Sequence, residues 1–259
     1  MRRFLLIIIV LLTVIGTCWA AKKPSPDEPV KPPQTPQTTV QNILPTHKHT
    51  SKCDDTVAEP VQIICILDRS GSMRSLAEDT IGGYNSFIEK QKKESGKATV
   101  TTVLFDDKYD KIVDNVDLES TPELTSAEYY ARGTTALLDA VGRTIMETAG
   151  NMEKEKICPA KRRVLVIIMT DGLENASKEY SKADVKAMIE ATTNEYKWEY
   201  IFMGANIDSV SEAASIGIRA DRAANYKASS EGVKKTFSFM DNAATAMRES
   251  GEVSDDWNK

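Results

Sequence analysis

The chain has 259 residues, of which 41% are hydrophobic and 7% aromatic, and its formal net charge is −5. A chain of this length can bury a core without disulfides or metal ions to hold it together. Its mildly acidic balance lacks the basic surface that nucleic-acid-binding proteins use, which argues against nucleic acid as a partner.

Residues 1–21 have the composition of a targeting segment. Two arginines stand at the start, residues 4–15 are almost entirely apolar, and small residues follow. This order predicts a secretory signal peptide that is cleaved on export. Two alternatives stay open. Residues 4–20 could remain as a membrane anchor, because the apolar stretch almost reaches spanning length, or Cys18 could carry a lipid. Each interpretation predicts an exported protein that is secreted, periplasmic or membrane-anchored.

Residues 22–58 are typical of a linker. They are rich in Pro, Thr and Gln and poor in apolar residues, so we expect an extended segment without a core. Cys53 lies in this segment, and Cys158 precedes a later apolar strand. If the strands that follow them are parallel neighbours, both thiols lie off the same end of the sheet. A Cys53–Cys158 disulfide is then reasonable in an oxidising compartment, and two free thiols are the alternative.

Strands and helices alternate through residues 59–250, which we expect to form the folded domain. The expected elements, in chain order, are a strand at 61–67, a helix at 75–93, a strand at 99–105 with a hairpin partner at 109–118, a helix at 136–152, a strand at 164–169, a helix at 182–195, a strand at 198–203, a short helix at 209–215, a weak strand near Tyr226 and a helix at 230–247. This alternation predicts an α/β fold with a doubly wound, mostly parallel sheet, one antiparallel edge strand and helices on both faces. Residues 251–259 are expected to form a flexible tail.

The first strand, VQIICIL, is a continuous apolar run rich in β-branched residues, as is typical of a strand covered on both faces. Cys65 lies inside it and is expected to be a small core residue. Asp68 follows directly, at the carboxyl end of the strand. In open α/β sheets, ligands bind at that edge.

Three short segments place oxygen-bearing side chains at or near the carboxyl ends of predicted strands. They are DRSGS (68–72), GTT (133–135) and TDG (170–172). Carboxylate and hydroxyl oxygens suit a hard cation such as Mg²⁺. Because the hydroxyls are neutral and at most two ligands are carboxylates, a cation held here would stay electrophilic. It would attract a further anionic oxygen, such as an acidic side chain of a partner.

In this order on alternating strands and helices, the three motifs resemble those of the von Willebrand factor type A domain and its metal-ion-dependent adhesion site. The resemblance covers about residues 60–250, and the segments VLFDD, TALLDAVG and IIMTDGLENAS are similar to stand-alone bacterial and phage members. It implies a Rossmann-like fold with a divalent ion, Mg²⁺ or Mn²⁺, at the top of the sheet. In the family the serines bind the metal directly, and the aspartates and threonine bind it directly or through water. The residues that match the metal-binding motif are Asp68, Ser70, Ser72, Thr135 and Asp171.

Three further residues are candidates for supporting the metal ligands. Asp106 follows another predicted strand, at the same edge if the topology holds, and a solvated turn is the alternative for it. Glu174 and Asn175 follow Asp171 and could order its loop, or they could simply lead into the next helix.

The sequence therefore favours a metal-dependent protein-binding module with an adhesion or assembly role, whose partner supplies Asp or Glu to the metal. One alternative is a structural ion that fastens the loops without a partner. Another is a Mg²⁺-dependent hydrolase. The hydrolase has less support, because the sequence has no Gly-rich phosphate loop and no histidine after residue 58, and no base is evident beside Ser70 or Ser72.

Overall fold

The computed structural model describes residues 60–155, 157 and 161–259. The expected targeting segment and linker lie outside the described residues, as do Cys53 and Cys158 of the expected disulfide. Within the part that the structure describes, no helix has both the length and the apolar character needed to cross a membrane.

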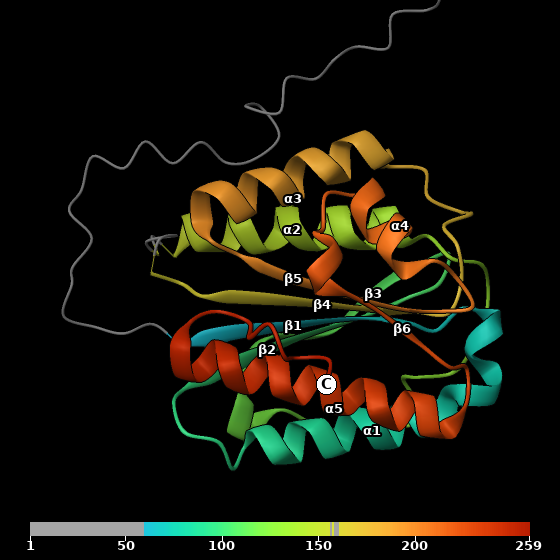
Figure 1. Cartoon of the computed structure of the whole chain (residues 1–259), viewed down its shortest axis with the longest axis horizontal. Coiled ribbons are helices and arrows are strands. Elements are labelled where there is room, and N and C mark those ends of the chain that lie inside the picture. The colour runs from blue at the N-terminus through green and yellow to red at the C-terminus, as the bar shows by residue number, and fades with distance from the viewer. Residues whose placement is uncertain (1–59, 156, 158–160) are drawn as a thin grey trace, which may run out of the picture. The chain divides into compact units, whose positions relative to one another are not determined.

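Six strands form one sheet in the order β3-β2-β1-β4-β5-β6 (Figure 1). Their bounds are β1 Val61–Asp68, β2 Ala98–Phe105, β3 Tyr109–Asp117, β4 Val164–Thr170, β5 Glu199–Ala205 and β6 Ala223–Tyr226. Neighbouring strands are parallel except for β2 and β3, which form the antiparallel hairpin at one edge. The predicted mostly parallel sheet with one antiparallel edge strand is confirmed.

Helices cover both faces of this sheet. Their bounds are α1 Ala77–Gln91, α2 Leu137–Lys154, α3 Lys182–Tyr196, α4 Ser209–Ser215 and α5 Ser230–Ser250, with short 3₁₀ helices at Gly71–Leu76, Leu118–Ser120 and Ala220–Arg222. Helices α1 and α5 lie on one face, and α2, α3 and α4 lie on the other (Figure 1). Every helix and strand expected from the sequence is present, which confirms the doubly wound α/β fold.

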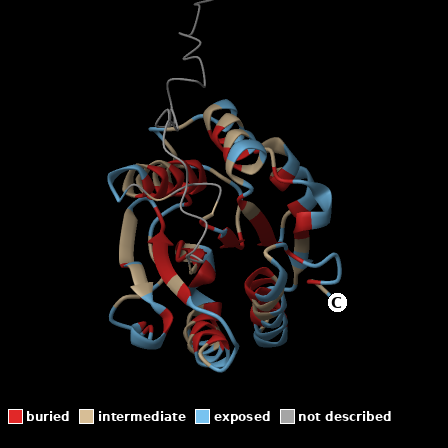
Figure 2. Ribbon diagram, turned by 90° about the vertical axis from the view of Figure 1, so that its left-hand side faces the viewer, coloured by how far each residue is buried: buried red, intermediate tan, exposed pale blue. Residues whose placement is uncertain are grey.

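The core is divided by the sheet into two layers, because successive side chains of a strand point to opposite faces. In β1, Ile63, Cys65 and Leu67 pack toward α1 and α5, whereas Ile64 and Ile66 pack toward α2 and α3. All five are fully buried, and the central strands are buried along their length (Figure 2). The expected core position of Cys65 is confirmed, and burial raises the pKa of its thiol to about 12.

Residues 251–259 are packed against the domain, so the prediction of a flexible tail is wrong. Trp257 is only 1% exposed, its ring lies edge-on to Phe239 with 6.0 Å between centroids, and its indole N–H donates to the carbonyl of Asp221 over 2.9 Å. The sequence GEVSDDWNK is mostly polar, and the burial of its single tryptophan depends on a site that distant segments create.

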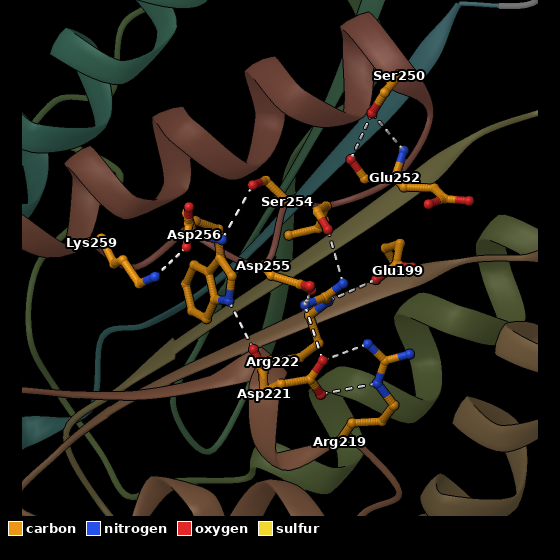
Figure 3. Close-up of polar contacts among 12 residues, drawn as sticks. Glu199, Arg219, Asp221, Arg222, Ser250, Glu252, Ser254, Asp255, Asp256 and Lys259 are labelled. Atoms are coloured by element: carbon orange, nitrogen blue, oxygen red, sulfur yellow. Dashed lines mark hydrogen bonds and ion pairs between the residues drawn. The ribbon is translucent and has the colours of Figure 1, made fainter.

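A buried arginine, Arg222, also binds the C-terminal segment. The side chain of Arg222 forms ion pairs with Glu199 at 3.1 Å, Asp221 at 3.2 Å and Asp255 at 3.6 Å (Figure 3). It also donates to the carbonyl of Val253 over 2.9 Å. The chain end is therefore tied to the segments next to β6.

Candidate functional site

Asp68 is the last residue of β1 and lies at the carboxyl edge of the sheet, where its side chain is fully buried. One carboxylate oxygen accepts a hydrogen bond from the backbone N–H of Ser70 over 2.7 Å, and the other accepts from the hydroxyl of Thr170 over 2.6 Å. Thr170 is the last residue of β4, which pairs with β1. The carboxylate is thus fixed by its own turn and by the neighbouring strand.

The two serines of the first motif turn toward the third motif. The hydroxyls of Ser70 and Ser72 lie 3.0 Å apart, and that of Ser72 donates to a carboxylate oxygen of Asp171 over 2.5 Å. Gly71 permits this path, because its N–H donates to the carbonyl of Gly133 over 3.2 Å and a Cβ at position 71 would lie 3.3 Å from the same oxygen. The first and second motifs therefore touch through their backbones.

Thr135 completes the group from the loop that leads into α2. Its side chain is buried, and the chain reaches it through Gly133, which has the left-handed φ of +66° that favours glycine. A Cβ placed on Gly172 would lie 3.5 Å from the Thr135 hydroxyl and 3.9 Å from the Ser72 hydroxyl. The structure thus brings the five predicted metal-binding residues to one place at the edge of the sheet.

The two carboxylates of this group lie in an environment that disfavours their charge. The pKa of Asp68 is raised to about 6, chiefly by burial and to a smaller extent by the nearby carboxylate of Asp171, although the hydrogen bonds from Thr170 and Ser70 lower it. Burial also raises the pKa of Asp171. Among the described residues, neither carboxylate forms an ion pair with a basic side chain. A cation bound here would supply the missing positive charge.

The chemistry of the donors fits a hard divalent cation, because all of them are carboxylate or hydroxyl oxygens. In the described ranges, no cluster of three or more His, Cys, Asp or Glu side chains is placed to hold a metal. A cation at this edge would therefore depend on serine and threonine hydroxyls as well as on aspartates. The residues that would hold it are Asp68, Ser70, Ser72, Thr135 and Asp171.

Arg69, which the sequence analysis did not single out, connects three loops beneath the site. Its side chain is 2% exposed, forms ion pairs with Asp106 at 2.9 Å and with Asp110, and donates to the carbonyl of Glu128 over 3.0 Å. Arg132 also pairs with Asp106, at 2.7 Å. Asp106 is fully buried, which excludes the alternative of a solvated turn. Burial raises its pKa, but the hydrogen bonds from Arg132 and Arg69 hold that pKa below its ordinary value.

No local signal in the sequence marks Arg69 as buried. It occupies a position between Asp68 and Ser70 where the motif specifies no residue type, and arginine is usually exposed. Tyr129 was missed for a similar reason: its hydroxyl donates to the carbonyl of Asp68 over 2.5 Å from a loop far along the chain. Both contacts depend on the meeting of loops that are separated in the sequence.

Asn175 and Glu174 join the loop after Asp171 to the segment that carries Thr135. The side chain of Asn175 accepts from the N–H of Thr135 over 2.9 Å, and its own N–H donates to the carbonyl of Thr135 over 3.0 Å. Glu174 accepts from the N–H of Leu138, in the first turn of α2, over 2.9 Å. It also accepts two backbone N–H groups and a serine hydroxyl of its own loop. These contacts connect the loop after Asp171 to Thr135 and to the first turn of α2.

Replacing Glu174 by glutamine is expected to lower the free energy of unfolding by about 1–3 kcal/mol, because an amide cannot accept all of these hydrogen bonds and leaves buried donors unpaired. It should also weaken metal binding by about tenfold, since it loosens a contact behind the ligands. Denaturant unfolding and a Mn²⁺ titration measure the two effects. Glu179→Gln, at an exposed surface ion pair, is the control and should change neither quantity appreciably.

No protein-family model and no curated protein sequence matches the chain. Solved structures do resemble it. A von Willebrand factor type A protein from Catenulispora acidiphila superposes with a TM-score of 0.52 and 15% identity over 73% of this chain and 43% of that one. Proximal thread matrix protein 1 from the mussel byssus, with a zinc-occupied MIDAS motif, gives a TM-score of 0.51 and 16% identity over 73% of this chain and 46% of its own.

The chain spans less than half the length of these two solved structures. At such low identity the similarity concerns the fold, and the fold agrees with the one that the three motifs imply. The mostly parallel sheet, the antiparallel edge hairpin and the helices on both faces are also those expected from the resemblance. The folded part of this chain therefore has the von Willebrand factor type A fold.

Proposed function

We propose that this protein is an exported binding module that holds Mg²⁺, or Mn²⁺, and through it engages an acidic side chain of a protein partner. The observation that carries the proposal is the meeting of five oxygen-bearing side chains from three loops at one edge of the sheet. The zinc-occupied MIDAS motif of the mussel byssus protein, which has the same fold, supports it. The role of such a module would be adhesion or assembly.

The charges of the candidate ligands suit the binding of an acidic side chain of a partner. A bound divalent cation would supply the positive charge that attracts the carboxylate of a partner. Ser70, Ser72 and Thr135 add no negative charge of their own, so the carboxylate of a partner would not meet a fully anionic ligand set. Asp68 and Asp171 are fixed by hydrogen bonds within the fold, which keeps the geometry ready for binding.

We propose a non-enzymatic role for this site. Ser72 contacts Ser70 and Asp171, and Asp68 is held by Ser70 and Thr170, so the polar groups of the site are engaged with one another. Both histidines of the chain precede residue 58, which leaves the folded part without the commonest general base.

The N-terminal part of the proposal rests on the sequence alone. Residues 1–21 would export the protein as a cleaved signal or would hold it in a membrane, and residues 22–58 would separate the folded domain from that membrane or surface. The domain would then face a partner outside the cytoplasm, in a secreted, periplasmic or membrane-anchored protein.

Thermal unfolding of residues 58–259, with EDTA and then with excess Mg²⁺ or Mn²⁺, tests the metal site. This piece contains both layers of the core and all five proposed ligands. A cation at about 100 times its dissociation constant should add about 2.7 kcal/mol of stability. For a domain of this size the unfolding temperature should rise by about 5–10 °C.

Asp68→Ala should remove this shift, and Asp114→Ala, at a half-exposed position in β3, should keep it. An unchanged unfolding temperature in the wild type would contradict the metal site. A shift without any metal-dependent protein binding would favour the structural ion over the adhesion role.

A further inference from the structure

Large hydrophobic side chains are exposed at three positions of the described chain, and all three lie at the edge of the sheet that carries the metal-binding residues. They are Tyr130, 44% exposed, Leu173, 55% exposed, and Val210, 41% exposed. Leu173 follows β4 and Val210 lies in the first turn of α4, directly after β5. Single exposed apolar residues are common on protein surfaces, but Tyr130 and Leu173 both lie next to metal-binding motifs and together point to an interaction surface.

Tyr130 is held in place next to the first motif. Its hydroxyl accepts a hydrogen bond from Arg132 over 2.7 Å. The guanidinium carbons of Arg132 and Arg69 lie 4.9 Å and 5.6 Å from the centre of its ring. Arg69 stands between Asp68 and Ser70, so the ring is fixed beside the metal-binding loop. An aromatic side chain that is already ordered loses little conformational freedom when a partner covers it.

Leu173 lies on the other side of the metal-binding residues. The two arginines that contact Tyr130 form ion pairs with Asp106, directly after β2, and with Asp110, in β3, whereas Leu173 follows β4. Because β1 lies between β2 and β4, the two exposed side chains flank the end of β1 from opposite sides.

The backbone around Leu173 is also fixed. The N–H of Gly172 donates to the hydroxyl of Thr170 over 3.3 Å, and Glu174 caps the residues that follow. The exposure of Leu173 is therefore a feature of an ordered loop next to Asp171, with hydrogen bonds on both sides of it.

We propose that Tyr130 and Leu173 are two apolar contacts that select the partner, whose acidic residue is flanked by large apolar side chains. This inference rests on the proposed function, because it assumes that the acidic residue binds at the metal. The two apolar contacts and the metal then form one continuous surface. An acidic segment with polar neighbours would leave both apolar side chains exposed and would bind more weakly.

Display of random linear peptides identifies this preference without knowledge of the partner. Residues 58–259 loaded with Mn²⁺ are used for capture, and bound peptides are released with EDTA. The expected consensus contains Asp or Glu with a large apolar residue within three positions. A synthetic peptide of that consensus is then titrated against the wild type and the variants in Mn²⁺.

Leu173→Ser and Tyr130→Ser are expected to weaken the consensus peptide at least tenfold while the Mn²⁺-induced rise in unfolding temperature stays unchanged. Val210→Ser is the matched control, since Val210 is a similarly exposed apolar residue at the same edge but follows β5. It should alter peptide affinity less than twofold.

Two other outcomes separate the inference from the proposed function. Acidic peptides without an apolar preference, or equal affinity in Leu173→Ser and Tyr130→Ser, would overturn the inference and leave metal-dependent binding intact. No EDTA-released enrichment of acidic peptides would overturn the proposed function itself, and the inference with it.

Discussion

Replacing Asp68 by asparagine is expected to stabilise the metal-free protein at pH 7.5 and to remove its response to Mg²⁺. The buried carboxyl group has a pKa of about 6 in the folded protein, against an ordinary 3.8. At neutral pH the folded protein therefore carries a charge that burial disfavours by about 3 kcal/mol. Removing that charge should recover about 1–3 kcal/mol, which raises the unfolding temperature by about 2–10 °C.

Asparagine can keep both hydrogen-bonded contacts that the aspartate makes at this position. Its side-chain oxygen can accept from the N–H of Ser70, as the aspartate does. Its amide can donate to the hydroxyl of Thr170, which in turn already lies 3.1 Å from the carbonyl of Gly172 and can donate to it. The variant loses the charge that a metal ion requires and keeps the hydrogen bonds that hold the turn.

The stability difference between the wild type and Asp68→Asn should depend on pH, and the protonation of Asp68 sets its direction. Well below pH 3.8, the ordinary pKa of the group, the carboxyl is protonated in both states and the variant should equal the wild type in stability. Between pH 4 and 6 the folded wild type binds more protons than the unfolded chain, so its free energy of unfolding falls as pH rises. Urea unfolding at pH 4, 5, 6 and 7.5, in EDTA, measures the difference. Equal stability of the two proteins at pH 7.5 would show that the buried carboxylate carries no such cost.

Metal binding should strengthen as the pH rises, whereas the stability of the metal-free wild type should fall. A divalent cation requires the ionised carboxylate, so acidification below pH 6 should weaken it by up to about tenfold per pH unit. The Mg²⁺-induced shift in the wild type should accordingly be large at pH 7.5 and small at pH 5. Asp114→Asn, at a half-exposed carboxylate in β3, is the control and should reproduce the wild type throughout.

Replacing Arg69 by methionine is expected to cause the largest loss of stability of the variants proposed, about 3–5 kcal/mol. The substitution removes a buried guanidinium that pairs with two aspartates and a backbone carbonyl. It leaves the buried Asp106 carboxylate with Arg132 alone as its ionic partner, and breaking one side of a buried ion pair is costly. Arg69→Lys should retain little of the stability that Arg69 provides, because an ammonium group cannot reach all three acceptors at once.

Arg69→Met should also reduce the stabilisation of the protein by Mg²⁺, because Arg69 fixes the turn between Asp68 and Ser70. Denaturant unfolding with and without Mg²⁺ measures both effects. Arg219→Met is the control, since Arg219 is 61% exposed and its ion pair with Asp221 should contribute less than about 1 kcal/mol. A loss in Arg69→Met no larger than in this control would refute the role assigned to the buried network.

The segments that carry the candidate ligands stood out in the sequence, and the resemblance of the three motifs to those of the von Willebrand factor type A domain then pointed to the five residues. The apolar run before Asp68 predicts a buried parallel strand, and parallel strands end at the same edge of a sheet. The spacing of Ser70 and Ser72 after Asp68, with Gly71 between them, describes a tight turn. The supporting residues were less certain. Glu174 and Asn175 were placed in the correct loop, but their bonds to Leu138 and Thr135 join segments that no short-range pattern connects.

The sequence by itself predicted the α/β fold, because strand and helix periodicity are local properties, and the resemblance of three short motifs to those of the von Willebrand factor type A domain pointed to the five candidate ligands. Only the tertiary structure decided that Arg69 and Asp106 are buried partners, that Trp257 packs the C-terminal segment against the domain, and that Tyr130 and Leu173 stay exposed beside the site. Each of these outcomes depends on which distant loop covers a side chain. Burial and ion pairing are properties of that long-range packing, and residue type alone does not specify them.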